Sequence, residues 1–322
     1  MLTKPNCPVI ALEEHYWDAE LTKQYTGPDV GREGEATKRL YDLGELRLRE
    51  MDEAGVDIQV LSHGAPSTQK LEKDVAAALT KQVNDRLHAT IQANPKRFAG
   101  FAALPTADPA AAADELERCV TKLGFKGAML HGLANGLFLD DKRFWPIYER
   151  AEKLDVPIYL HPGLPDARVT DAYYKDYAKE FPQLLRAGWG YTVETATLAI
   201  RMVLSGVFDK YPKLAFILGH FGETLPFLVW RVDMAMARPG AAREAGFRDV
   251  FCSHFHVTTS GFFSDPALLC CVMELGIDRI LFAIDWPFVM NPPGVRWLES
   301  VPLSDADKAK IASGNARRLL RM

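Results

Sequence analysis

Eight short apolar runs recur along the chain, and most are followed by a segment with the periodicity of an amphipathic helix. The runs predict strands at residues 9–15, 56–62, 98–104, 127–132, 156–162, 213–219, 250–260 and 279–285. Between them, apolar residues recur every three or four positions, which predicts helices at 37–54, 67–93, 110–123, 142–154, 192–204, 222–237 and 265–275. This alternation of strands and helices is typical of parallel strands closed into a (β/α)8 TIM-type barrel.

Two segments break the alternation. His15 to Gly34 is polar and without a clear period, and it predicts a loop over the end of the first strand. Gly163 to Ala187 follows the fifth strand and is polar and rich in tyrosine. Loops of this length in compact domains are commonly functional, so we expect a lid-like insertion there. No shift in composition divides the chain, and residues 1–322 are predicted to form a single domain.

Composition and charge narrow the classes of partner. The formal net charge is −4 and no basic run occurs, which argues against a nucleic-acid-binding face. No apolar run is long enough to cross a bilayer, and the N-terminus does not resemble a signal peptide. The five cysteines show no Cys-x-x-Cys spacing and are interpreted as reduced thiols. We therefore expect a cytoplasmic protein without nucleic-acid or membrane partners.

The residues that could bind a metal or take part in catalysis lie mainly at the predicted strand ends, which form one rim of such a barrel. The residues at these ends are Glu13, His15, His63, His131, His161, His220 and Asp285. Five of the eight histidines fall there, which a random scatter would not produce. Because side chains alternate along a strand, Glu13 and His15 are expected to face the same way and Glu14 the opposite way. Carboxylate oxygens and imidazole nitrogens are ligands for divalent metals, so the rim predicts a metal site.

The details favour one metal ion over two. Binuclear hydrolytic barrels carry His-x-His on the first strand and a bridging lysine on the fourth or fifth. Here the first strand offers Glu13 and His15, and the fourth ends in His131. Lys126 lies at the opposite end of that fourth strand. The predicted cofactor is one divalent ion, Zn²⁺ or Mn²⁺, because these ligand types do not discriminate between the two.

Four motifs carry a family resemblance. They are Ala-Leu-Glu-Glu-His at 11–15, Tyr-Leu-His-Pro at 159–162, Leu-Gly-His-Phe-Gly-Glu at 218–223 and Ile-Asp-Trp-Pro-Phe at 284–288. The chain resembles the amidohydrolase-2 branch of the amidohydrolase superfamily from Val9 to near Leu320. Within this branch it is most similar to non-oxidative aromatic acid decarboxylases of the γ-resorcylate (2,6-dihydroxybenzoate) type. The resemblance implies a homodimer or homotetramer acting on a small aromatic carboxylic acid.

The resemblance also implies roles for particular residues. The implied metal ligands are Glu13, His15, His161 and Asp285. The implied catalytic residues are Asp285, His220 and Glu223, the last holding His220. The candidate substrate-binding residues are Arg231, Tyr191, Phe288 and His63. Phe288 would be an aromatic wall, and Arg231 and Tyr191 lie where some family members face a neighbouring subunit. His63 stands where the family usually has an apolar or amide-bearing pair, so it would alter the pocket wall.

These assignments predict metal-dependent, non-oxidative decarboxylation of a hydroxybenzoate-type acid, with release of CO2 and a phenol. Asp285 would donate a proton to the ring carbon that bears the carboxylate, so it must hold a proton at the working pH. The alternative is a metal-dependent hydrolase or hydratase acting on an ester, a lactone or an oxo-acid. The roles of three further residues stay open. His131 is either a structural residue or a substrate contact. Arg47 and Arg49 either approach the substrate or form surface salt bridges.

Overall fold

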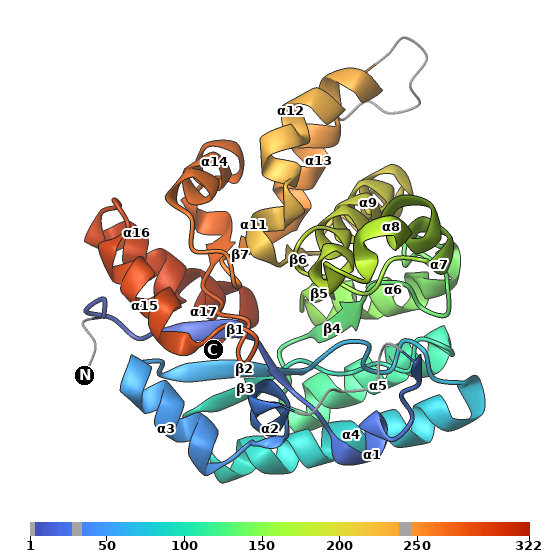
Figure 1. The fold of residues 1–322 in the computed structure, drawn as a ribbon, viewed down its shortest axis with the longest axis horizontal. Coiled ribbons are helices and arrows are strands. Elements are labelled where there is room, and N and C mark those ends of the chain that lie inside the picture. The colour runs from blue at the N-terminus through green and yellow to red at the C-terminus, as the bar shows by residue number, and fades with distance from the viewer. Residues whose placement is uncertain (1–3, 28–33, 238–245) are drawn as a thin grey trace.

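The computed structural model describes residues 4–27, 34–237 and 246–322, in which eight parallel strands form two sheets. The first sheet contains β1 (Ile10–Tyr16), β2 (Ile58–His63) and β3 (Phe98–Gly100). The second contains β4 (Ala128–His131), β5 (Ile158–His161), β6 (Phe216–Leu218), β7 (Phe255–Thr258) and β8 (Ile280–Leu281). Single bridges from Leu12 to Ala283 and from Ala102 to Ala128 join the sheet edges. The strands therefore follow chain order around a closed (β/α)8 barrel, as predicted (Figure 1).

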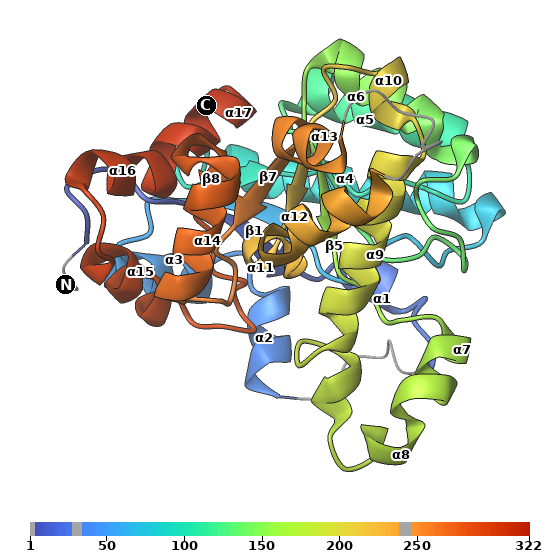
Figure 2. The same ribbon diagram turned by 90° about the horizontal axis from the view of Figure 1, so that it is seen from above.

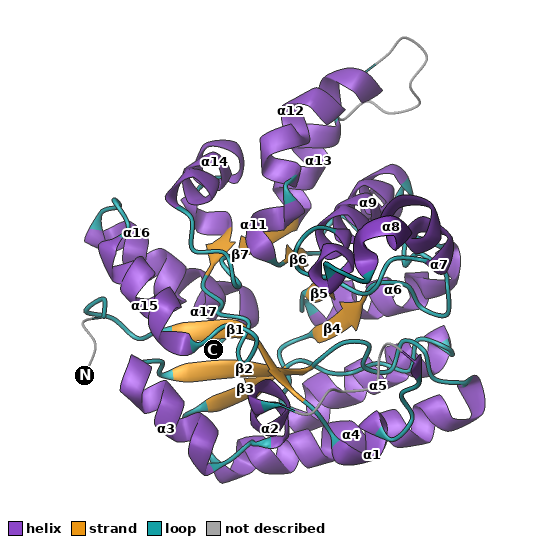
Figure 3. Cartoon of the chain, viewed as in Figure 1, coloured by secondary structure: helices purple, strands orange, loops and turns teal. Residues whose placement is uncertain are grey.

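Helices surround the strands (Figure 3). The longer ones are α3 (Glu45–Ala54), α4 (Lys73–Ala93), α5 (Pro109–Leu123), α6 (Trp145–Leu154), α9 (Gly190–Leu204), α12 (Leu225–Met236), α13 (Phe247–His254), α14 (Asp265–Leu275) and α15 (Asn291–Ser300). The shorter ones are α1 (Ala19–Thr22), α2 (Glu35–Tyr41), α7 (Ala167–Val169), α8 (Lys175–Ala178), α10 (Val207–Lys210), α11 (His220–Glu223), α16 (Asp305–Ala309) and α17 (Asn315–Leu320). Among the residues that the structure describes, none of these helices combines the length and apolar character that a bilayer span requires.

Alternate residues of each strand pack in two apolar layers. One layer fills the barrel interior and includes Ile10, Leu12, Val60, Phe101, Met129, Tyr159, Ile217 and Leu281. The other lies between the strands and the helices and includes Val9, Ala11, Leu61, Leu130, Leu160, Leu218 and Val257. Burying each such side chain contributes about 1.5–3 kcal/mol. Because the interior is filled by side chains, catalytic groups can meet only at the rim.

A bulge in β1 turns two polar residues into the barrel. Ile10 and Leu12 face the interior, so strict alternation would place Glu13 and His15 outside. The pairing of β1 with β2 shifts between Ala11 and Glu14, and Glu13 has a φ of 61°. The carboxylate of Glu14 accepts the backbone N–H of Ile284 at 2.9 Å and that of Trp286 at 3.1 Å. The extra residue of the bulge therefore returns Glu13 and His15 to the interior. The hydrogen bonds of Glu14 connect β1 with the segment that follows β8.

The seventh predicted strand is wrong over its first half. Residues 250–254 belong to α13, and only Phe255–Thr258 form β7. Phe247 and Phe251 are both buried, and a spacing of four residues places two side chains on one face of a helix as well as on one face of a strand. Phe247 and Phe251 form the buried face of a short helix, which leads directly into β7.

Three other predictions required correction. The helix predicted at 37–54 is interrupted, and the Asp42 side chain accepts the N–H groups of Gly44 and Arg47 to begin α3. The helix predicted at 67–93 begins only at Lys73. The helix predicted at 222–237 is broken where Phe221 and Gly222 adopt positive φ angles before α12. Polar caps and left-handed residues interrupt patterns that are otherwise apolar at helical spacing.

The two predicted loops contain short helices. The loop from His15 to Gly34 includes α1, capped by Asp18, and its residues 28–33 lie outside the described residues. The segment after β5 contains α7, α8 and helical turns at Thr170–Tyr174 and Pro182–Leu185. Figure 2 shows α7 and α8 projecting from the barrel beside α9. The predicted function of this segment as a lid stays a prediction.

Candidate metal centre and active site

Four side chains meet at the carboxyl ends of the strands. Glu13 and His15 come from β1, His161 ends β5, and Asp285 follows β8. One possible ligand atom from each residue lies within 4.8 Å of all the others. His15 Nε2 lies 3.3 Å from Asp285 Oδ1, and His161 Nε2 lies 3.2 Å from Glu13 Oε1. The structure thus brings together the four residues that the sequence assigned to one metal.

The donor atoms of this cluster fit a divalent cation. Within the described part of the chain, Glu13 Oε1, His15 Nε2 and Asp285 Oδ1 are buried without a hydrogen-bond partner. Burying unpaired polar atoms is costly, so three such atoms at one place indicate a ligand. Two carboxylate oxygens and two imidazole nitrogens are a suitable donor set for Zn²⁺ or Mn²⁺. The residues present therefore fit the predicted metal.

Neighbouring groups orient the two imidazole rings. His161 Nδ1 lies 2.8 Å from the Pro162 carbonyl, to which it can donate a hydrogen bond. His15 Nδ1 lies 3.3 Å from Ser62 Oγ. Each ring thereby directs Nε2 into the centre, an arrangement typical of metal-binding histidines. His131 lies behind His161 with its Nδ1 2.9 Å from that of His161, which is consistent with leaving it out of the ligand set.

His220 and Glu223 lie beside this cluster. His220 Nδ1 is 2.7 Å from Glu223 Oε1. Its Nε2 is 3.7 Å from Glu13 Oε1 and 3.8 Å from Asp285 Oδ2. Burial lowers the pKa of His220, but the negative charges of Glu223 and Glu13 outweigh burial and raise it well above its ordinary value. The raised pKa favours a protonated His220, whose Nε2 faces Asp285 Oδ2.

The electrostatics of Glu13 and His15 favour metal binding. Burial acts to raise the pKa of Glu13, but His220, His161 and His15 together lower it below its ordinary value. Burial lowers the pKa of His15. An ionised carboxylate and a neutral imidazole are the forms that coordinate a cation. Both shifts favour the protonation state that a metal ligand requires.

Phe288 borders the same cluster. Its ring centroid lies 5.8 Å from that of His15, and 55% of the residue is exposed. An exposed ring at this distance stands at the mouth of the site, where the predicted aromatic wall would be. Tyr191 lies in the first turn of α9, where its hydroxyl accepts a hydrogen bond from Arg186 at 3.1 Å, and Arg231 is exposed on α12. Their contact with a substrate stays a prediction.

His63 is engaged in holding the chain together. Its Nε2 accepts the backbone N–H of Asp18 at 2.9 Å, and its Nδ1 lies 2.9 Å from the Gly64 carbonyl. The Tyr25 hydroxyl also lies 3.5 Å from Nδ1. These contacts fix the start of α1 against the end of β2. The predicted role of His63 as a substrate contact stays a prediction.

Sequence reasoning left the function of Arg47 open, and the structure buries it completely. Its guanidinium donates to the His15 carbonyl at 2.5 Å and to Gln59 Oε1 at 3.1 Å. It also lies 3.9 Å from the centroid of the buried Trp286 ring. Arg47 therefore supports the backbone on both sides of the centre. Arg49 is exposed and lies 3.9 Å from Glu53, as expected for a surface pair.

Three hydroxyl groups around Glu13 were not among the site residues predicted from the sequence. Tyr159 from β5, Thr258 from β7 and Ser260 just beyond it all contact the Glu13 carboxylate. A signal was present, because Tyr159 precedes His161 by two residues and therefore shares its face of the strand. Thr258 and Ser260 have the same spacing.

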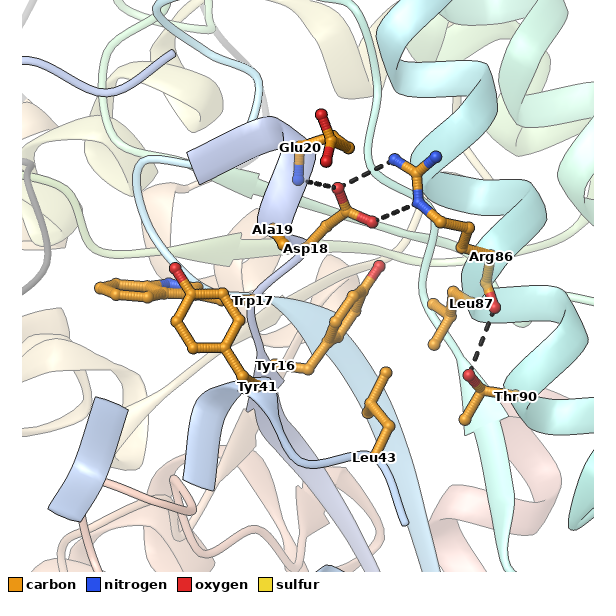
Figure 4. A pocket seen from close by; sticks show the side chains of 10 residues that line it. All are labelled: Tyr16, Trp17, Asp18, Ala19, Glu20, Tyr41, Leu43, Arg86, Leu87 and Thr90. Carbon is orange, nitrogen blue, oxygen red and sulfur yellow. Dashed lines mark hydrogen bonds and ion pairs between the residues drawn. The ribbon is translucent and has the colours of Figure 1, made fainter. Parts of the chain in front are cut away.

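A separate cavity of about 680 Å³ lies beside β1 (Figure 4). Its walls include the rings of Tyr16, Trp17 and Tyr41. Tyr16 belongs to the layer between strands and helices, so this cavity lies outside the barrel wall. Its principal charged groups, Asp18 and Arg86, pair with each other at 2.6 Å. This cavity is thus distinct from the cluster formed by Glu13, His15, His161 and Asp285, and we assign it no function.

Known proteins are similar to this chain both in sequence and in fold. A γ-resorcylate decarboxylase of Polaromonas sp. is 40% identical over 97% of this chain and 98% of its own length. The crystal structure of a dihydroxybenzoic acid decarboxylase from Polaromonas sp., with bound manganese and the inhibitor 2-nitroresorcinol, has a TM-score of 0.89 at 39% identity and covers 98% of this chain and 97% of its own. A 5-carboxyvanillate decarboxylase from Sphingomonas paucimobilis has a TM-score of 0.91 at 34% identity, with 98% and 100% covered.

The family comparison agrees with the site. The model described as Amidohydrolase matches residues 13–322, and its match begins at Glu13, the first residue of the four-residue cluster. The match covers nearly the whole barrel, including His161, His220 and Asp285. With its strands in a closed ring and its acidic and imidazole groups at their carboxyl ends, the chain belongs to the amidohydrolase family.

Proposed function

We propose that this protein is a metal-dependent carboxy-lyase. It decarboxylates a hydroxybenzoate-type aromatic acid without oxidation and releases CO2 and a phenol. The observation that carries the proposal is the convergence of Glu13, His15, His161 and Asp285 beside His220. Relatives with 34–40% identity over almost the whole chain are named as decarboxylases of dihydroxybenzoate and carboxyvanillate, which supports this reaction over hydrolysis.

The four clustered side chains would hold one divalent cation, and the manganese in a related structure supports Mn²⁺ as the ion. When bound, the cation supplies Lewis-acid stabilisation of negative charge on the substrate. Phe288 at the mouth offers an aromatic face against which a benzoate ring can pack. These contacts would fix the ring relative to the carboxyl group of Asp285.

Asp285 would be the residue that moves a proton. Its Oδ1 faces His15 Nε2 among the ligand atoms, and its Oδ2 faces His220 Nε2. The protonated carboxyl group would give its proton to the ring carbon that bears the carboxylate. The bond from that carbon to the carboxylate then breaks, CO2 leaves, and the bonding electrons restore the aromatic ring. The product keeps the proton, so Asp285 must be protonated again in each cycle.

His220 would return that proton to Asp285. Its Nε2 lies 3.8 Å from Asp285 Oδ2, and Glu223 holds its Nδ1 at 2.7 Å. The Glu223 carboxylate favours the protonated imidazole and fixes the direction of Nε2. Small movements of the His220 ring could bring it within hydrogen-bonding distance of Asp285. His220 and Glu223 would thus act together as a proton reservoir and an orienting pair.

The experiment is incubation of the Mn²⁺-loaded protein with 2,6-dihydroxybenzoate and 5-carboxyvanillate, with CO2 and the phenolic product measured together. We expect equal amounts of both products from at least one acid. Benzoate, which lacks the ortho hydroxyl, is the matched control and should not react. No release from any ortho-hydroxybenzoate, together with hydrolysis of lactones or esters, would overturn the proposal in favour of a hydrolase.

We also propose that the protein is a single-domain homodimer or homotetramer of the cytoplasm. α12 and α13 pack together and extend away from the strands (Figure 1). On α12, Phe227, Trp230 and Met234 are 80%, 66% and 57% exposed. Their spacing of three and four residues places them on one face, as expected of a contact with a second copy. Arg231 on the same helix would then approach the neighbouring subunit, and the free cysteines are consistent with a reducing compartment.

A further inference from the structure

The two oxygens of the Glu13 carboxylate have contrasting surroundings. Oε2 accepts hydrogen bonds from the Tyr159 hydroxyl and, at 2.5 Å, from the Ser260 hydroxyl. Oε1 has no hydrogen-bond partner among the described residues and faces His161 Nε2 at 3.2 Å. Glu13 itself is completely buried. One oxygen is therefore held by the protein, and the other is left for the metal centre.

The direction of these hydrogen bonds is set by proton count. Tyr159 and Ser260 each have one hydroxyl proton, and a carboxylate can only accept. Both protons are therefore directed at Glu13. Thr258 Oγ1 lies 2.9 Å from the Tyr159 oxygen and 2.8 Å from Ser260 Oγ, and it donates to Glu13 Oε2 over a longer distance of 3.4 Å. Ser260 Oγ also accepts the backbone N–H of His220 at 3.0 Å. The hydroxyl groups form one directed network that ends on Glu13 and reaches His220.

The backbone at Gly219 closes the other side of this carboxylate. A Cβ atom at this position would lie 2.8 Å from Glu13 Oε2 and 3.1 Å from Ser260 Oγ. Contacts below 3.0 Å require a group to move, and the end of the Glu13 side chain is the group that could. Only a residue without a side chain leaves room for the carboxylate as it is held. Glu13 is therefore confined by hydroxyl groups on one side and by backbone on the other.

We propose that Tyr159 and Ser260 are positioning residues that hold Glu13 so that it offers a single oxygen, Oε1, to the metal. The proposal rests on the metal centre of the proposed function, but it concerns metal binding and not the reaction. A carboxylate fixed before the ion arrives needs no ordering on binding, and loss of such outer partners typically weakens metal affinity by about 10- to 100-fold. Thr258 supports the two donors, and Gly219 leaves the space that they require.

The test is a titration of the metal-free protein with Mn²⁺ alone, followed by the electron paramagnetic resonance signal of free Mn²⁺. Tyr159→Phe keeps the ring and removes only the donor. We expect its Kd for Mn²⁺ to rise about tenfold or more. Ser260→Ala and Gly219→Ala should weaken binding in the same direction. Tyr148→Phe is the matched control, because Tyr148 is also fully buried and donates to a carbonyl, that of Leu139, at 2.7 Å.

The outcomes separate the inference from the proposed function. Weaker Mn²⁺ binding in Tyr159→Phe and Ser260→Ala, with Tyr148→Phe unchanged, supports the positioning role, whatever the catalytic activity. If both variants keep thermal melting curves of a folded protein and bind Mn²⁺ within twofold of wild type, the inference is overturned. An equal loss in Tyr148→Phe would also overturn it, since general destabilisation would explain the effect. If wild type itself does not bind Mn²⁺, the metal centre fails and the proposed function fails with it.

Discussion

Four residues of the proposed site have backbone conformations that side chains rarely adopt. The φ angles of Glu13, His220, Glu223 and Asp285 are 61°, 50°, 54° and 71°. Such conformations cost about 1–3 kcal/mol each and persist only where surrounding contacts enforce them. Here the enforcing contacts include the hydrogen bonds of Glu13 with Tyr159 and Ser260. The strain occurs where the chain must turn a functional side chain toward the centre.

The role of Asp285 as proton donor is tested by Asp285→Asn. The amide cannot donate a carboxyl proton but keeps the shape of the side chain and one oxygen. We expect kcat to fall by at least about 100-fold while Mn²⁺ remains bound, because proton transfer by a positioned acid contributes about 10²–10⁴-fold. The measurements are steady-state kinetics and metal content of the purified variant.

Asp278→Asn is the control for this substitution, because Asp278 pairs at the surface with Lys310 at 3.2 Å. Its kcat should equal that of wild type. A turnover by Asp285→Asn within about threefold of wild type would exclude Asp285 as the proton donor and leave it only a possible ligand.

At the scale of elements, α3 supports the site through one arginine. Arg47 crosses from α3 to the backbone of β1 at His15 and stacks on Trp286, which follows β8. Trp286 in turn donates from its indole nitrogen to Glu50 of the same helix at 2.9 Å. One helix outside the barrel therefore fixes the ends of two strands that are distant in sequence. The positions of His15 and Asp285 depend on this contact.

We predict that Arg47→Met lowers the free energy of unfolding by about 2–4 kcal/mol, because buried acceptors lose their charged donor. Urea denaturation at pH 7 would measure it. Arg49→Met on the same helix is the matched control and should change stability by less than about 0.5 kcal/mol, since Arg49 forms only an exposed ion pair. Equal effects of the two substitutions would contradict a supporting role for Arg47.

At the scale of the whole molecule, buried histidines make stability depend on pH. Burial lowers the pKa of His256 in β7 to about 3, with Arg279 and Arg318 acting in the same direction. Burial likewise lowers the pKa of His63 to about 4. Both pKa values lie below the ordinary value of about 6.5, so the unfolded chain binds more protons than the native state in this range. The contribution of these two histidines to stability is therefore complete above about pH 6.5 and is lost as the pH falls toward these values.

The prediction for His256 is a loss of about 2 kcal/mol of unfolding free energy between pH 7 and pH 5, which follows from its shift by linkage. His256→Gln removes this proton uptake, so the variant should lose about 2 kcal/mol less than wild type over the same interval. Urea denaturation of the metal-free proteins at the two pH values compares them. Parallel losses in both proteins would show that His256 is not a source of the dependence.

Assembly is the other property of the whole molecule that can be tested. Light scattering should give wild type the mass of two or four chains. Trp230→Asp places a charge in the exposed apolar face of α12 and should reduce the mass toward that of one chain. Val75→Asp, which alters a 42% exposed residue on α4, should leave the mass unchanged. A wild-type mass of one chain would remove α12 as a contact between copies.

The sequence by itself determined the order of the elements and the identity of the clustered residues. Apolar runs that alternate with helical periods leave few arrangements other than a parallel barrel, and such a barrel brings its strand ends to one rim. Seven acidic and imidazole residues could therefore be grouped at that rim although they lie far apart in the chain, and the family resemblance selected Glu13, His15, His161 and Asp285 from among them. Local patterns were less reliable where two periods compete, as in residues 250–254, whose aromatic spacing suits a helix as well as a strand.

Only the tertiary structure decided how each side chain is aimed. The bulge at Glu13, the burial of Arg47 and the engagement of both His63 nitrogens depend on partners from other strands and helices. The hydroxyl groups around Glu13 come from β5 and the end of β7, more than a hundred residues away in sequence. Periodicity reports which face of an element a residue occupies, because it arises from the local backbone. Hydrogen-bond partners arise from packing between elements, and no local pattern encodes them.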